Sequence, residues 1–280
     1  MTVRVVVDST ADIPPARARE LGITVVPLLV LFGDEEFRDG VDITNEEFYR
    51  RLATSPVMPT TATPPPALFE QAFRSLIADG ATGILAIHIG SELSASYSTS
   101  TTAASVVMRD THVPIEVIDS RTVSAGFGLP AEIVAAEARQ GRSLEELAAH
   151  ARDLLSRIHL IAVLDTLDFL QRGGRIGRAQ AMLGTLLSVK PLIEVRDSAV
   201  VPLEKVRTRS KALDRIGELI ARRGELEAVA IAESDETVGK QLETVAQTFW
   251  HGPIEHFALG PVVGTHAGPG AGAIVALTRQ

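Results

Sequence analysis

Short runs of β-branched and aliphatic residues alternate with helical stretches along the whole chain, and this alternation limits the possible folds more than any other feature. Strands that interleave with helices build α/β units. The predicted strands in this pattern are Val3–Val7, Thr24–Leu31, Ile84–Ile89, Ile115–Ile118, Ile158–Val163, Ala228–Ile231 and Ile254–Leu259. The first four are continuous apolar runs, which is typical of a parallel sheet covered by helices on both faces. We therefore expect a three-layer α/β/α arrangement in the first half.

The pattern changes in the second half, where a mixed sheet is expected. Two strands, Pro191–Arg196 and Ala199–Val206, flank the turn residues Asp197 and Ser198, which is the sequence pattern of an antiparallel hairpin. We place a domain boundary near Ser156. The two expected domains are residues 1–156, an N-terminal α/β domain with a mainly parallel sheet, and residues 157–280, a C-terminal α/β domain with a mixed sheet.

The amino-acid composition excludes several classes of function. The 280 residues include no cysteine, so thiolate metal sites, iron–sulfur clusters, disulfides and cysteine nucleophiles are excluded. A net charge of −8 with 4% aromatic residues argues against a nucleic-acid partner. No apolar run reaches the eighteen or so residues of a membrane span, and the start shows no secretory signal. We expect a cytoplasmic protein without stable membrane insertion, and the absence of the common nucleotide and metal motifs predicts no cofactor and no metal.

Polar residues follow two predicted strands, where ligands bind in an open α/β sheet. Asp8–Asp12 carries carboxylates and hydroxyls that could bind a metal or a ligand, but we interpret it as a helix cap. Ile89–Tyr97 runs into a helix rich in serine and threonine, so its N–H groups and the helix dipole could form an anion site. Capping explains that segment equally well, and both interpretations stay open.

Two loops have an unusually stiff or specified backbone. Ser55–Pro66 is rich in proline and threonine and is interpreted as a rigid extended loop, which would hold hydroxyls such as that of Thr61 at fixed geometry. Gly260–Gly270 surrounds His266 with glycine and proline, so we interpret it as a loop shaped for close approach to another group. A lone histidine is more often structural, and this backbone makes His266 the exception among the seven.

Glycines interrupt a helical pattern between three arginines, Arg172, Arg175 and Arg178. Such a basic edge on an acidic protein suits an anionic ligand or partner surface. A helix end with solvated arginines is the simpler alternative.

In this order and spacing the segments resemble the DegV family of bacterial fatty-acid-binding proteins, over essentially the whole chain. The matching segments are Val7–Thr10, Phe37–Ile43, Thr61, Leu93-Ser94 with Tyr97, Ile118–Ser120, Gly173–Ile176, Lys190-Pro191, Gly260-Pro261, Gly264–His266 and Gly268–Gly270. The resemblance implies two α/β domains that hold a long-chain fatty acid between them. It also implies a non-catalytic role: the chain would be the acyl-carrying subunit of a fatty acid kinase, presenting the carboxylate to a separate ATP-dependent subunit that makes an acyl phosphate.

Carried over residue by residue, the resemblance places the fatty acid carboxylate on Thr61, Ser94, Ala95 and His266. It also makes the edge of Arg172, Arg175 and Arg178 the docking site for the kinase subunit. Hydroxyls, N–H groups and one imidazole suit a carboxylate that has to be handed over. We expect the carrier itself to be a monomer.

The chain departs from the family pattern at four positions. Ala62 and Thr63 stand in place of a Ser-Gln pair, Gly90 in place of serine and Ala95 in place of glycine. The methyl group of Ala95 would narrow the approach to nearby N–H groups, which leaves the preferred acyl chain open.

An enzymatic alternative uses the same side chains. Ser94 and His266, oriented by Asp8 or Asp119, could form a nucleophile–base–acid set for hydrolysis of an acyl ester or thioester. This hypothesis requires the Ser94 hydroxyl within hydrogen-bonding distance of His266.

Overall fold

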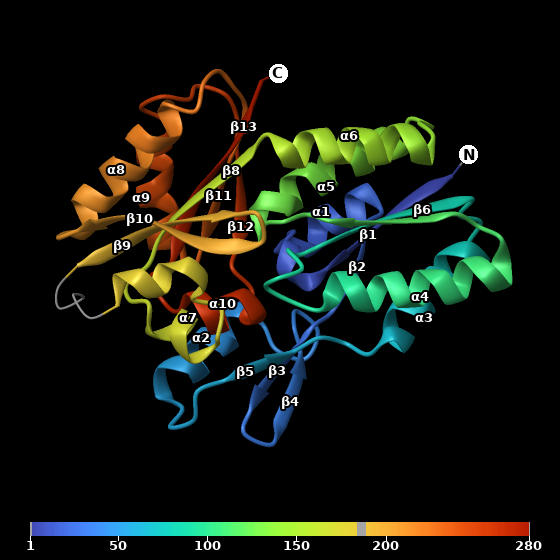
Figure 1. Cartoon of the computed structure of the whole chain (residues 1–280), viewed down its shortest axis with the longest axis horizontal. Helices are drawn as coiled ribbons and strands as arrows, with labels where there is room; N and C mark the ends of the chain where they lie inside the picture. The colour runs from blue at the N-terminus through green and yellow to red at the C-terminus, as the bar shows by residue number, and fades with distance from the viewer. Residues whose placement is uncertain (1, 184–188, 280) are drawn as a thin grey trace.

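The computed structural model describes residues 2–183 and 189–279, and its first sheet is parallel throughout. The strands are β1 (Val3–Asp8), β2 (Thr24–Val26), β6 (Gly83–His88) and β7 (Ile115–Asp119), in the order β2-β1-β6-β7 (Figure 1). Val5 and Val7 pack toward helices α5 (Ala125–Ala138) and α6 (Leu144–Ser156). Val6, between them, packs toward α3 (Pro66–Ala78) and α4 (Ser96–Thr111). Successive side chains of a strand point to opposite faces, so this sheet is buried on both sides, as predicted.

The second sheet is mixed, which is also as predicted. Its strands are β8 (Ile158–Val163), β9 (Lys190–Arg196), β10 (Ala199–Val206), β11 (Leu226–Glu233), β12 (Ile254–Ala258) and β13 (Gly272–Thr278), in the order β10-β9-β8-β13-β11-β12. Only β11 and β12 run parallel. Helices α8 (Arg209–Ala221) and α9 (Glu236–Ala246) cover one face. The β9–β10 hairpin turns at Asp197 and Ser198, both with positive φ, which is the two-residue turn that suits a twisted hairpin.

The predicted strand Thr24–Leu31 is wrong, because it is two strands in two sheets. Pro27 lacks an N–H donor and cannot continue a ladder, so β2 ends at Val26. The chain then forms β3 (Leu29–Phe32), which pairs antiparallel with β4 (Glu35–Arg38) and β5 (Thr60–Ala62). Helix α2 (Asn45–Thr54) packs beside this small third sheet (Figure 1). The proline-rich segment is therefore tied to a sheet and is not a free loop.

The C-terminal segment also differs from the prediction. The last predicted strand ends at Leu259, yet the structure has a further strand, β13, which lies inside the second sheet between β8 and β11. The predicted loop Gly260–Gly270 contains helix α10 (Pro261–Ala267). Proline at the first position of a helix loses no hydrogen bond, so Gly260-Pro261 is a helix start here.

The remaining elements are short connections. They are η1 (Ser9–Ala11), α1 (Pro15–Leu21), α7 (Asp168–Arg172) and η2 (Gly177–Met182). Among residues 2–183 and 189–279, no helix has the length and apolar character needed to span a bilayer.

Candidate functional site

A cavity lies between the face of the second sheet opposite α8 and α9 and the loops at the carboxyl ends of β1 and β6. The second sheet contributes small and aliphatic side chains, and the first half contributes loop residues and the start of α4. The apolar lining from the second sheet includes Leu160, Ala162, Ile193, Val195, Ala232 and Ala273. The cavity has a volume of about 160 Å³, roughly ten times the space that one water molecule needs. The cavity can therefore hold a sizeable apolar group.

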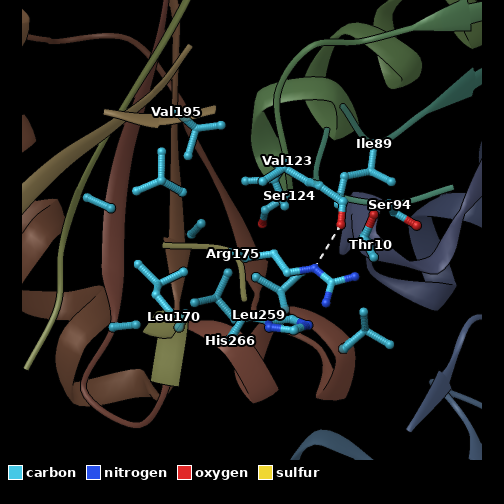
Figure 2. A pocket seen from close by; sticks show the side chains of 18 of the residues that line it. Thr10, Ile89, Ser94, Val123, Ser124, Leu170, Arg175, Val195, Leu259 and His266 are labelled. Carbon is cyan, nitrogen blue, oxygen red and sulfur yellow. Dashed lines mark hydrogen bonds between the residues drawn. The ribbon is translucent and has the colours of Figure 1, made fainter. Parts of the chain in front are cut away.

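Hydroxyls and an imidazole meet at one end of this cavity, the polar end, formed by Thr61, Thr63, Ser94, Arg175 and His266. The Oγ1 atom of Thr61 lies 2.9 Å from Nε2 of His266. Ser94 Oγ lies 3.2 Å from the hydroxyl of Thr63. Figure 2 shows Ser94 and His266 on two sides of the Arg175 side chain, with Val195 well apart from them. The structure thus brings Thr61, Ser94 and His266 to one place, although they are far apart in the sequence.

His266 is kept neutral by its surroundings. Burial, together with the positive charge of Arg175, lowers the pKa of the imidazole to about 4. Its Nδ1 atom is buried without a hydrogen-bond partner among the described residues. A side chain on Gly173 would overlap this nitrogen, so the first of the paired glycines lets the loop close over the ring. A neutral imidazole can offer or accept one hydrogen bond without burying a cation.

Arg175 reaches into the cavity. Its Nε donates to the carbonyl oxygen of Leu93 at 3.1 Å, the dashed line in Figure 2, and one Nη donates to the carbonyl of Gly173 at 2.7 Å. Two donors of the guanidinium are therefore committed to backbone groups, and its charge reaches the polar end. Arg175 supplies positive potential there without the free bidentate fork that grips a carboxylate most firmly.

The other predicted site residues take different positions. Arg172, the last residue of α7, and Arg178 in η2 are exposed, so they differ from the half-buried Arg175. Ala95 caps the start of α4 with an exposed side chain and does not line the cavity. The amino end of α4 nevertheless begins directly after Ser94 and Ala95, so its positive dipole end lies beside the Ser94 hydroxyl.

The side chains of the hydrolase hypothesis do not form the required set. Both Ser94 and His266 are described, and no hydrogen bond joins them; Ser94 instead contacts Thr63 and Ser96. Asp119 accepts the N–H groups of Ser91, after β6, and of Arg121, after β7. Asp8 caps η1, as predicted, and its other oxygen lies 3.1 Å from Nδ1 of His88.

A serine–histidine–aspartate chain does occur elsewhere in the molecule. Nε2 of His88 lies 2.8 Å from the hydroxyl of Ser100, and Asp8 holds the opposite ring nitrogen. All three side chains are fully buried between β1, β6 and α4, where no substrate reaches them. We interpret this chain of hydrogen bonds as satisfied core polarity.

The comparisons with known proteins agree along the whole chain. Residues 2–279 match the family model described as "Uncharacterised protein, DegV family". The chain belongs to the DegV family. A DegV domain-containing protein of Streptomyces coelicolor is 35% identical over 283 residues, which cover 99% of each chain.

Two solved structures show the same architecture. DegV of Bacillus subtilis, a fatty acid binding protein, is 30% identical, with a TM-score of 0.88 and coverage of 99% of this chain and all of that one. A stearic acid-binding protein of Eubacterium ventriosum is 26% identical, with a TM-score of 0.90 and coverage of 99% and 98%. The two-domain α/β architecture implied by the DegV resemblance is therefore confirmed.

Sequence reasoning missed two contributors to the polar end. Thr63 belongs to the hydroxyl-bearing proline-rich segment but has no part in the predicted carboxylate site, yet its hydroxyl contacts Ser94. Arg175 was assigned to an outer edge, whereas its guanidinium lines the cavity. The alternation in Thr61–Thr63 was the available signal for Thr63, because residues two apart on an extended strand share a face.

Proposed function

We propose that the chain binds a long-chain fatty acid in the cavity between its two halves, residues 1–156 and 157–280. The observation that carries the proposal is the combination of an apolar lining with a polar end that carries three hydroxyls and a neutral imidazole. An acyl tail in such a lining gains about 0.8 kcal/mol for each methylene removed from water. Thr61, Ser94 and His266 would bind the carboxylate, with the positive end of α4 and Arg175 balancing its charge.

We further propose that the bound carboxylate is presented to an ATP-dependent kinase subunit in the cytoplasm. In that reaction a carboxylate oxygen attacks the terminal phosphorus of ATP, the bond to ADP breaks, and an acyl phosphate forms. Hydroxyls and a neutral ring hold the carboxylate by single hydrogen bonds, which suits release better than a bidentate arginine. The carrier itself supplies no catalytic residue in this scheme.

Native mass spectrometry of the purified protein, followed by denaturation and identification of any released lipid, tests the binding proposal. We expect one fatty acid per chain, or uptake of one added oleate or palmitate. As a control, Ala232→Phe fills the cavity from β11 and should abolish uptake, whereas Val25→Phe, on the exposed side of β2, should not. A folded protein that stays empty with every added fatty acid would refute the proposal.

The kinase step has a separate test. The loaded protein is incubated with ATP and an extract of its own organism, and acyl phosphate is trapped with hydroxylamine. We expect a double variant, Arg172→Ala with Arg178→Ala, to bind fatty acid normally and to form acyl phosphate at least tenfold more slowly. Arg109→Ala with Arg222→Ala, which removes two exposed arginines elsewhere, is the matched control. Equal rates for the two double variants would remove this edge as the docking site.

A further inference from the structure

The start of helix α10, in the second half, packs against two carboxylates of the first half. Its capping residue is Gly260, which has no side chain, and Pro261 has no N–H group to satisfy. The N–H of Gly260 donates to Oδ1 of Asp12 at 2.9 Å, and the carboxylate of Asp39 lies against the same turn. The N–H of the capping residue is therefore satisfied by a side chain from more than 200 residues earlier in the sequence.

Both carboxylates are fixed and enclosed. Asp12 is 8% exposed and its other oxygen accepts the hydroxyl of Ser124 at 2.5 Å. Asp39 is 5% exposed and accepts the hydroxyl of Ser9 at 2.8 Å. A methyl group built on Gly260 would lie 3.0 Å from Oδ1 of Asp12 and 3.2 Å from Oδ1 of Asp39, so the two carboxylates converge on one backbone position.

The opposite end of α10 carries the imidazole of the polar end. His266 lies in the last turn of this seven-residue helix, with Nε2 2.9 Å from Thr61. In between, Gly264 packs directly on the rings of Phe48 and Tyr49, which leaves no room for a side chain. A short helix fixed at its start and pressed on one side moves as a rigid unit, so its start sets the position of His266.

We propose that Asp12 and Asp39 are positioning residues for the ligand carboxylate: by holding the start of α10, they set how His266 meets Thr61. This proposal rests on the proposed function for its ligand, but the placement of His266 is measurable without one. Neither aspartate lines the cavity, so neither is expected to touch the fatty acid.

The charge on this pair changes near neutral pH. Burial is the main cause that raises the pKa of Asp39 to about 7, and it raises the pKa of Asp12 well above its ordinary range. The other titratable groups that face the pair are Asp8 from β1, Tyr49 from α2 and, facing Tyr49, Asp235 before α9, all of them acidic. Ionisation of Asp39 therefore adds negative charge beside carboxylates, at the point where α10 begins.

Nuclear magnetic resonance of the ¹⁵N-labelled histidine rings in ligand-free protein tests the proposal. The pKa of His266 is about 4, so its own ring does not titrate between pH 6 and 8 and reports on its surroundings. The signal is assigned by its loss in His266→Gln. In the unmodified protein we expect the His266 shifts to change with an inflection near pH 7. That inflection should vanish in Asp39→Asn and persist in Asp42→Asn, an exposed aspartate of the same segment.

Fatty acid affinity is the second readout. Asp12→Asn and Asp39→Asn should each weaken oleate binding at least tenfold at pH 7, while Asp42→Asn leaves it unchanged. Circular dichroism and urea unfolding identify a variant that fails to fold, in which case Asp12→Glu and Asp39→Glu replace it. If the His266 signals of Asp12→Asn and Asp39→Asn coincide with those of the unmodified protein at every pH, the positioning role is overturned, even if the protein binds fatty acid. An unmodified protein that binds no fatty acid overturns the proposed function and leaves the His266 result standing.

Discussion

The hydroxyls of Thr61 and Ser94 provide the most direct test of the polar end at the scale of single residues. We expect Thr61→Val and Ser94→Ala each to weaken fatty acid binding by about 1.5–3 kcal/mol, the usual loss for a hydrogen bond to a charged group, or about 10- to 150-fold. Titration calorimetry with oleate measures the change. Thr60→Val and Ser98→Ala remove exposed neighbouring hydroxyls and should be neutral. If all four variants bind alike, the carboxylate binds elsewhere.

The adjacent residues Gly173 and Gly174 are glycine for different reasons, and an alanine variant of each distinguishes the two reasons. A methyl group on Gly173 overlaps Nδ1 of His266, so we expect Gly173→Ala to displace the ring and to weaken ligand binding at least tenfold. Gly174 has φ +70° and open space around it, so Gly174→Ala should cost only backbone strain, about 1 kcal/mol of unfolding free energy, with binding unchanged. Urea unfolding and calorimetry on both variants check this. Equal loss of binding in the two would contradict the assignment.

At the scale of elements, the tip of the β9–β10 hairpin rests on the first half beside Gly90. The N–H of Ser198 donates to the carbonyl of Arg121 at 2.8 Å, and Arg121 pairs with Asp197 at 2.8 Å. A Cβ on Gly90 would lie 3.0 Å from Ser198 Oγ and 3.1 Å from its Cα, so a residue without a side chain fits this contact best.

A double-mutant cycle measures this contact between the halves. Gly90→Ser should lower the unfolding free energy by about 1–3 kcal/mol, since it overpacks a closed contact. Ser198→Gly removes the obstructing side chain and suits the positive φ of 62° at that position. We therefore expect the double variant to be more stable than the sum of the two single effects, by about 1 kcal/mol. Strict additivity in urea unfolding would show that the two residues do not press on each other.

Elements whose local pattern agrees with their surroundings were predictable from sequence. β1, β6 and β7 are dominated by β-branched and aliphatic residues, and the β9–β10 turn needs the backbone that Asp197 and Ser198 adopt. Prediction failed where one residue decided between two structures. Pro27 divides a single apolar run between two sheets, and Gly260-Pro261 begins a helix whose capping residue donates its N–H to Asp12 of the first half.

At the scale of the whole molecule, the polar end depends on the packing of the two halves. Thr61 comes from the third sheet, Ser94 from the start of α4, and Arg175 and His266 from the second half. No local sequence pattern shows that these residues lie close together. The prediction that Thr61, Ser94 and His266 share one site therefore came from the family resemblance and not from periodicity. Arg175 faces the cavity because its Nε donates to the carbonyl of Leu93, 82 residues away in the sequence. Neither periodicity nor family resemblance could predict that contact.

Two buried groups of the site make opposite contributions to the pH dependence of stability. The pKa of Asp39 is raised from 3.8 to about 7, so its contribution is complete below pH 4 and is lost as pH rises toward 7. The pKa of His266 is lowered from 6.5 to about 4, so its contribution is complete above pH 6.5 and is lost as pH falls toward 4. Each changes the unfolding free energy by at most about 1.4 kcal/mol per pH unit.

Urea unfolding between pH 4.5 and 6.5 separates the contributions of Asp39 and His266 to the unfolding free energy. Relative to the unmodified protein, the stability of Asp39→Asn should rise with pH, because the unmodified protein alone loses stability as this carboxyl ionises in the unfolded chain and stays protonated in the folded one. Under the same comparison the stability of His266→Gln should fall with pH, because the unmodified protein alone gains as its imidazole deprotonates in the unfolded chain. Since the two slopes oppose each other in the unmodified protein, comparison with each variant is needed to separate them. Parallel profiles for the two variants would mean that these groups are not held in the protonation states that the cavity requires.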